Sequence, residues 1–93
     1  MEFEWDLAKE RANMKKHGFS FADAMEAFQD PSGIQLIDQK HSVAEGRFFW
    51  VGKVKSGSVL TVWFTRREDK IRIIGCANWR KLRSFYDEAT KNK

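Results

Sequence analysis

The residues of this chain best suited to chemistry are arginines in its second half. Arg66 and Arg67 close one predicted strand, Arg72 lies within the next, and Arg80 follows shortly after it. Guanidinium groups match the geometry of phosphate oxygens and stabilise negative charge that develops during phosphoryl transfer. We therefore expect several cations around one end of a sheet. Arg72 can equally be read as a cation on the strand surface with no catalytic role.

Aromatic residues lie among these cations in the sequence, namely Trp50, Trp63, Trp79 and Tyr86. Flat side chains can stack on unpaired bases, so basic and aromatic residues together indicate a nucleic acid ligand. Trp50 and Trp63 lie in the middle of predicted strands, where a place in the core is the simpler interpretation. For Trp79 and Tyr86 both interpretations stay open.

Two histidines offer proton transfer near neutral pH. His17 precedes Gly18, where a cation would stabilise the carboxyl end of a helix, so capping is its simpler role. His41 belongs to a compact polar group just before a strand, in which it could exchange protons with Glu45. A polar loop is the simpler account of that group. Its other members are Ser42 and Arg47.

Patterns typical of metal and cofactor sites are missing from the sequence. Cys76 is the single cysteine, which excludes a disulfide framework and a cysteine-based zinc site. The two histidines are far apart, and the sequence contains no glycine-rich phosphate loop or nucleophile elbow. We therefore expect any hydrolysis to need no metal or other cofactor and to be assisted by cations.

The charge is unevenly divided along the 93 residues. Residues 1–45 carry a net charge of −4, and residues 46–93 carry +8. A basic half on a protein of pI about 9.4 indicates a polyanionic or acidic partner. A solvated face of lysines and arginines with no partner would give the same composition.

The length and hydrophobic content favour one globular domain, residues 1–93. No apolar run approaches the roughly 20 residues that cross a bilayer, and the acidic amino terminus does not resemble a secretory signal. We expect a cytoplasmic protein with no membrane segment.

Local signals place the elements that must position these groups. Asp6 can cap a helix that runs to about Lys16 and stops at Gly18. Ser20 and Asp23 have the spacing of a capping box at the start of a second helix. The expected strands are residues 3–5 at an edge, 34–37, 48–54, 59–65 and 71–76. The last helix, with Asn78 as its cap, has its apolar positions at Leu82, Phe85, Tyr86 and Ala89.

Short connections restrict how the three long strands pair. Strands joined by two to five residues must be antiparallel, because parallel strands need a crossover of a dozen residues or more. In the last strand, simple alternation puts Ile71, Ile73 and Gly75 on one face and Arg72, Ile74 and Cys76 on the other. The sequence therefore predicts an α+β domain of two N-terminal helices, an antiparallel sheet and a C-terminal helix.

Stretches along nearly the whole chain resemble BrnT-type toxins. The opening signature is carried by Phe3-Glu4-Trp5-Asp6, Lys9, Asn13, His17-Gly18, Ser20-Phe21, Ala24, Phe28 and Asp30-Pro31. The next block matches at His41-Ser42, Glu45 and Arg47, and the last strands match at residues 62–65, Arg67 and residues 71–74.

BrnT-type proteins are the toxins of bacterial type II toxin–antitoxin pairs, with a fold similar to RelE-type ribonucleases. The resemblance implies that this chain cleaves RNA and so blocks translation. It also implies a BrnA-like antitoxin with a ribbon-helix-helix domain that neutralises the toxin. Operator DNA would then be reached only through that antitoxin.

The resemblance also implies catalytic residues. It carries such roles over to Arg67 and Arg72, which stand at matching positions, and extends them to Arg80 and Tyr86. The chain departs from the family after the last strand, where Ala77 occupies a position at which many members have arginine. Arg80, one helical turn further on, could replace that charge.

Two functions of different classes follow. The leading hypothesis is an endoribonuclease in which a ribose 2′-hydroxyl attacks the adjacent phosphate, with Arg67, Arg72 and Arg80 stabilising the transition state. Its proton acceptor stays open among Tyr86, His17, Glu45 and the lysines. The alternative is a non-catalytic basic binding module or co-repressor that holds an antitoxin or nucleic acid. A protein whose charge only keeps it soluble would need neither.

Overall fold

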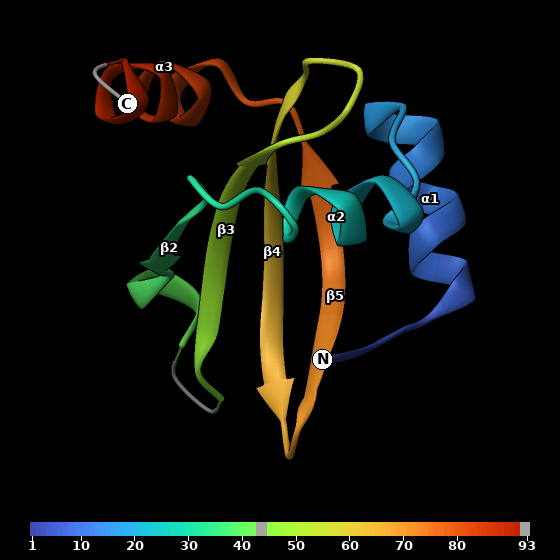
Figure 1. Cartoon of the computed structure of the whole chain (residues 1–93). Helices are drawn as coiled ribbons and strands as arrows, with labels where there is room; N and C mark the ends of the chain where they lie inside the picture. The colour runs from blue at the N-terminus through green and yellow to red at the C-terminus, as the bar shows by residue number, and fades with distance from the viewer. Residues whose placement is uncertain (43–44, 92–93) are drawn as a thin grey trace.

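A five-stranded sheet forms the centre of the chain, with helices packed on its faces (Figure 1). The computed structural model describes residues 1–42 and 45–91. Its elements in chain order are β1 (Glu2–Trp5), α1 (Leu7–His17), α2 (Phe21–Ala27), β2 (Ile34–Ile37), the 3-10 turn η1 (Gln39–His41), β3 (Arg47–Lys53), β4 (Val59–Arg67), β5 (Lys70–Ala77) and α3 (Arg80–Thr90). None of these helices is long and apolar enough to cross a membrane.

The strands lie in the order β1-β5-β4-β3-β2. The pairs β3–β4 and β4–β5 are antiparallel, as the short connections predicted, and the pair β2–β3 is antiparallel as well. The edge strand β1 pairs with β5 in the parallel direction, so the sheet is mixed rather than antiparallel throughout. The rule on short connections does not bear on this pair, because most of the chain separates β1 from β5.

The predicted helix starts and stops of the first half are confirmed. The Asp6 side chain accepts hydrogen bonds from two amides of the first turn of α1, and Gly18 ends that helix with a φ of 79°. Ser20 and Asp23 form the capping box of α2, each side chain accepting from the other residue's amide. These signals work because both partners lie within a few residues of each other.

One face of the sheet carries the main core, under α2 and beside α1. Phe21, Ala24 and Ala27 of α2 pack there against Phe64 and Ile73 of the central strands. The predicted place in the core is confirmed for Trp50, which packs against this cluster and whose indole N–H donates to the Ala27 carbonyl oxygen at 2.8 Å. The same prediction is wrong for Trp63, which is half-buried on the opposite face and belongs to neither buried cluster.

The buried polar side chain of Asn13 attaches α1 to the sheet. The Asn13 amide group donates to the carbonyl oxygen of Cys76 at 2.9 Å and accepts from the Cys76 amide at 3.0 Å. It pairs with this part of β5 much as a neighbouring strand would, because β1 pairs only with residues 70–73. The Cys76 thiol is buried, and burial raises its pKa to about 12.

A bulge in β5 overturns the predicted facing of its second half. Phe64 of β4 pairs with Ile73, whereas the preceding Trp63 pairs with Gly75, so Ile74 is an extra residue. Beyond it the alternation is inverted, because a bulge sets two residues against one. Cys76 therefore joins the core with Ile73, and Gly75 lies on the same face as Arg72.

The second face is covered by α3 at one end only. Leu82 and Tyr86 of α3 pack there with Val51 and Val59 at the ends of β3 and β4 nearest the helix (Figure 1). The predicted apolar face of this helix is only partly buried, since Phe85 is 45% exposed. The predicted cap Asn78 is wrong: the N-cap is Trp79, and its side chain makes no capping hydrogen bond.

Candidate functional site

Two arginines flank a buried threonine on the open part of the second face. Thr65 of β4 pairs with Arg47 of β3 on one side and with Arg72 of β5 on the other. Residues paired across neighbouring strands point to the same face, and strands lie about 4.8 Å apart. The Cα atoms of the two arginines are therefore about 10 Å apart. We call Arg47, Thr65 and Arg72 the arginine row.

Ion pairs hold the arginines of this face in place. The Arg72 guanidinium contacts the Glu4 carboxylate of β1 at 3.1 Å, and both side chains are half-buried. Arg67, two residues after Thr65 on the same face, contacts the Glu45 carboxylate at 3.2 Å in an exposed position. The structure thus brings Arg67 and Arg72 onto neighbouring positions, and each already has a carboxylate partner.

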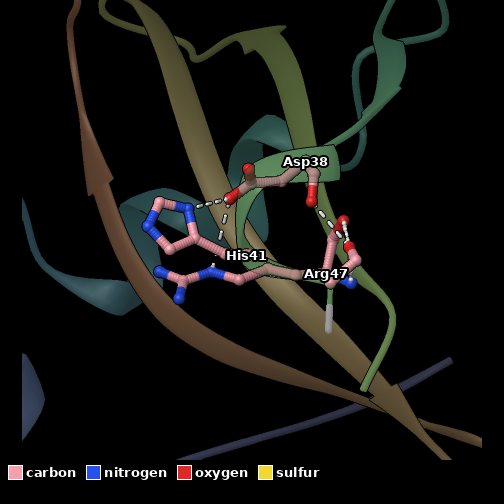
Figure 2. Close-up of polar contacts among 4 residues, drawn as sticks. Asp38, His41 and Arg47 are labelled. Carbon is pink, nitrogen blue, oxygen red and sulfur yellow. Dashed lines mark hydrogen bonds and ion pairs between the residues drawn. The ribbon is translucent and has the colours of Figure 1, made fainter. Parts of the chain in front are cut away.

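A buried carboxylate connects Arg47 to a histidine (Figure 2). The Asp38 Oδ2 atom lies 2.9 Å from His41 Nδ1 and 3.7 Å from Arg47 Nε. A carboxylate can only accept, so Nδ1 of the imidazole carries the proton of this hydrogen bond. Nε2 is then the ring nitrogen that can accept a proton from a ligand, and the His41 side chain is 51% exposed.

Ser42 fixes the loop that places Asp38 beside Arg47. Its hydroxyl donates to the Asp38 carbonyl oxygen at 2.6 Å and accepts from the Arg47 amide at 3.0 Å. The Asp38 amide in turn donates to the Arg47 carbonyl oxygen at 2.8 Å. These hydrogen bonds hold Asp38, Ser42 and Arg47 together and place the His41 imidazole beside the Arg47 side chain (Figure 2).

The arginine row contains two buried polar atoms whose hydrogen-bonding capacity is unused. Among the described residues, neither Arg47 Nε nor Thr65 Oγ1 has a hydrogen-bond partner. Unpaired buried donors and acceptors cost about 1–3 kcal/mol each, so native proteins contain few of them. Two such atoms on paired residues mark this row as a place suited to a polar ligand.

The expected gathering of cations at one end of the sheet is wrong for Arg80. Arg66 lies at the same end as Arg67 but points to the opposite face, where its guanidinium lies over the Phe64 ring. Arg80 begins α3 and is exposed. It follows the end of β5 opposite Arg72, and the five steps from residue 72 to residue 77 alone extend about 17 Å along the strand.

Tyr86 lies apart from the arginine row and is buried in the contact between α3 and the turn after α2. Its hydroxyl donates to the Asp30 carboxylate. Burial first, and then this hydrogen bond to Asp30, raise the pKa of Tyr86 to about 12. A phenol held protonated in this way is a poor proton acceptor near neutral pH.

Two other proton-acceptor candidates, Glu45 and His17, are also engaged elsewhere. Glu45 pairs with Arg67, and His17 lies edge-on against the Trp63 ring with ring centres 5.8 Å apart. Sequence reasoning passed over Asp38 and Thr65. The sequence offered two signals for them. Asp38 lies three residues before His41, and Thr65 lies two residues before Arg67.

Comparisons with known proteins identify the family. A family model described as the ribonuclease toxin BrnT of type II toxin–antitoxin systems matches residues 5–82. The fold is similar to that of the Brucella abortus ribonuclease toxin BrnT, with a TM-score of 0.65 and 22% identity, over 85% of this chain and 96% of that one. A search of curated proteins found no match. The predicted α+β class and the resemblance are thereby confirmed, and this chain belongs to the BrnT family of type II toxins.

Proposed function

We propose that this chain is an endoribonuclease that cleaves RNA without a metal ion and so inhibits translation in the cytoplasm. The observation that carries the proposal is the arginine row with an aspartate-oriented histidine beside it on an open sheet face. Membership of a family described as ribonuclease toxins supports RNA as the substrate.

The arginine row would hold the phosphate to be cleaved. A phosphate over Thr65 can accept from the guanidinium groups of Arg47 and Arg72, which lie on either side of it. Negative charge on these oxygens increases as the fifth bond to phosphorus forms, and preorganised donors stabilise that charge. Arg67 lies close enough on the same face to bind a neighbouring phosphate.

His41 would act as the proton acceptor. The 2′-oxygen forms a bond to phosphorus as the bond from phosphorus to the 5′-oxygen breaks. The 2′-hydroxyl proton passes to Nε2 of the imidazole, and the departing 5′-oxygen takes a proton from water. Asp38 keeps the imidazole in the tautomer that this step needs and stabilises the imidazolium that results. The products are a 2′,3′-cyclic phosphate and a 5′-hydroxyl end.

The test uses purified protein and end-labelled single-stranded RNA. We expect the two product ends just named, and no cleavage where a 2′-deoxynucleotide replaces the attacking ribose. Arg47→Ala, Arg72→Ala and His41→Ala should each slow cleavage by about 10²–10³-fold. The matched control is Arg83→Ala, an exposed arginine of α3, which should cleave like the parent. Full activity in all three site variants would overturn the assignment.

The rival function, a non-catalytic basic binding module, has one observation in its favour. Arg67 and Arg72 are already paired with carboxylates, so part of the positive charge on this face is compensated. A binding module would retain RNA with steep salt dependence and yield no shortened products. The cleavage assay distinguishes the two functions directly.

The proposed partner is a BrnA-like antitoxin with a ribbon-helix-helix domain, through which operator DNA would be bound. Exposed cations at the start of α3, Arg80, Lys81 and Arg83, would suit an acidic segment of such a partner. Co-expression with a neighbouring ribbon-helix-helix protein should restore growth and yield a complex that co-purifies. Growth arrest that this neighbour does not relieve would reject it as the antitoxin.

A further inference from the structure

An aromatic row lies directly beside the arginine row on the same face. Two residues along β3 and β4 from Arg47 and Thr65 are Phe49 and Trp63, which pair with each other, and Trp63 also pairs with Gly75 of β5. Residues two apart on a strand are about 6.6 Å apart. The distance between the aromatic row and the arginine row is therefore similar to the spacing of neighbouring nucleotides in a single strand.

Gly75 allows the Trp63 indole to lie flat over β5. A Cβ atom at residue 75 would come within 2.2 Å of the Trp63 ring. Trp79, in the segment leading into α3, stacks on that ring with centres 4.8 Å apart and planes 8° apart. Trp63 therefore has the backbone of Gly75 on one face and the indole of Trp79 on the other.

Among residues 1–42 and 45–91, no second ring is stacked on the outer face of Trp79. The residue is 39% exposed although one of its faces rests on Trp63, and Phe49 meets it at a steep angle of 73°. Helix capping does not account for a tryptophan here, since the N-cap prefers small polar residues and Trp79 makes no capping hydrogen bond. A large flat ring is thus presented to solvent at the end of a supported stack.

Positive charge continues around this stack. A hollow of about 210 Å³ beside Trp63 is lined by Lys9, Lys16 and His17 of α1 together with Ile74. A polynucleotide that enters the arginine row would meet these cations as its backbone passes the aromatic row. Cations next to an exposed ring are the combination by which proteins hold unpaired nucleotides.

We infer that Trp79 is a stacking site for an unpaired base of the RNA, in the nucleotide next to the phosphate that the arginine row holds. The inference rests on the proposed RNA substrate and adds a binding site that neither the family match nor the catalytic residues imply. Base stacking on an aromatic side chain tolerates every base, so this site fixes the position of the strand without selecting a sequence.

Binding to a 2′-O-methyl RNA oligonucleotide tests the site without cleavage, because the attacking hydroxyl is blocked. Trp79→Ala should weaken this binding by about 5- to 150-fold, the range measured for stacking residues. Trp79→Phe should recover most of the affinity. Phe85→Ala removes another exposed aromatic ring of the same helix region and should leave binding unchanged.

A second comparison separates stacking from a general loss of structure. The parent should bind an oligonucleotide with an abasic site at the stacked position more weakly, and Trp79→Ala should lose little further affinity for it. Parent-like binding by Trp79→Ala, or an equal loss on the abasic oligonucleotide, would overturn the stacking site. A loss confined to antitoxin binding would assign the ring to a protein interface and also overturn it. In each case cleavage by the parent would leave the ribonuclease proposal intact.

Discussion

Replacing Tyr86 with phenylalanine removes one hydroxyl and keeps the ring. The ring is buried against Val51 and Val59, and the hydroxyl donates to the Asp30 carboxylate in the turn after α2. Asp30 also accepts from the amide of Ser32 at 2.8 Å and from a β3 amide at 2.7 Å. The variant therefore deletes one charge-assisted hydrogen bond without opening a cavity or leaving the carboxylate unpaired.

The size of the loss follows from this geometry. Hydrogen bonds to charged groups contribute about 1.5–3 kcal/mol, so we expect Tyr86→Phe to lower the free energy of unfolding by about 2 kcal/mol. In a domain of this size each kcal/mol moves the melting temperature by about 4–8 °C, which predicts a decrease of about 10 °C.

The loss should depend on pH in a defined direction. Burial opposes ionisation of Asp30, but hydrogen bonds from Tyr86 and two amides outweigh it, so the pKa of Asp30 falls below 3.8. The pKa of Tyr86 rises from 10.0 to about 12. A lowered carboxyl pKa contributes stability above about pH 4 that is lost as the pH falls through the folded value. A raised phenol pKa contributes stability below pH 10 that is lost as the pH rises toward 12, so the difference between parent and variant is largest between these limits.

Urea unfolding at acidic, neutral and strongly alkaline pH measures this difference, with RNA cleavage assayed at a temperature where the variant is folded. Ser84→Ala, at an exposed position of the same helix, should change stability by less than about 0.5 kcal/mol. A structural role for Tyr86 predicts reduced stability with normal cleavage. Unchanged stability with lost cleavage would refute this reasoning and return Tyr86 to the catalytic residues.

Three further substitutions test the attachment of α1 and the site. Asn13→Ala leaves the buried amide and carbonyl groups of Cys76 without hydrogen-bond partners, so it should lower the free energy of unfolding by about 3 kcal/mol in urea titrations. A loss below about 1 kcal/mol would contradict the role of Asn13 in attaching α1. Asp38→Asn should slow RNA cleavage by about 10²-fold without weakening RNA binding, because His41 loses its orienting carboxylate while Arg47 keeps its charge; equal losses in rate and affinity would argue against it. Glu4→Gln frees Arg72 and should make the salt dependence of RNA binding steeper by about 0.7 in the log–log slope, and an unchanged slope would place the phosphate elsewhere.

The sequence predicted those parts of the fold whose determinants are local. Asp6, Gly18 and the Ser20–Asp23 capping box each act on backbone groups within four residues, so both partners are visible in one short stretch. The antiparallel pairing of β3, β4 and β5 follows from connections too short for any other arrangement. The parallel pairing of β1 had no local signal.

The candidate site depends on contacts between distant segments. The ion pairs of Arg67 with Glu45 and of Arg72 with Glu4 join residues 22 and 68 positions apart, and neither spacing has a periodic signature. The distance between Arg80 and these arginines, in contrast, could have been predicted from the geometry of a β-strand. A tight turn keeps Arg72 close to Arg67, and the rest of β5 then carries the chain away from both.

The bulge at Ile74 explains why the largest error in the predicted sheet lies beside the inferred stacking site. With simple alternation, Gly75 would face the core and a larger side chain would lie next to Trp63 on the open face. The extra residue turns Gly75 outward, and the missing Cβ lets the Trp63 indole lie flat and support Trp79. Bulges occur often beside functional sites because they redirect side chains. The bulge that makes the predicted alternation of β5 wrong therefore also places the stacked rings of Trp63 and Trp79 next to the arginine row.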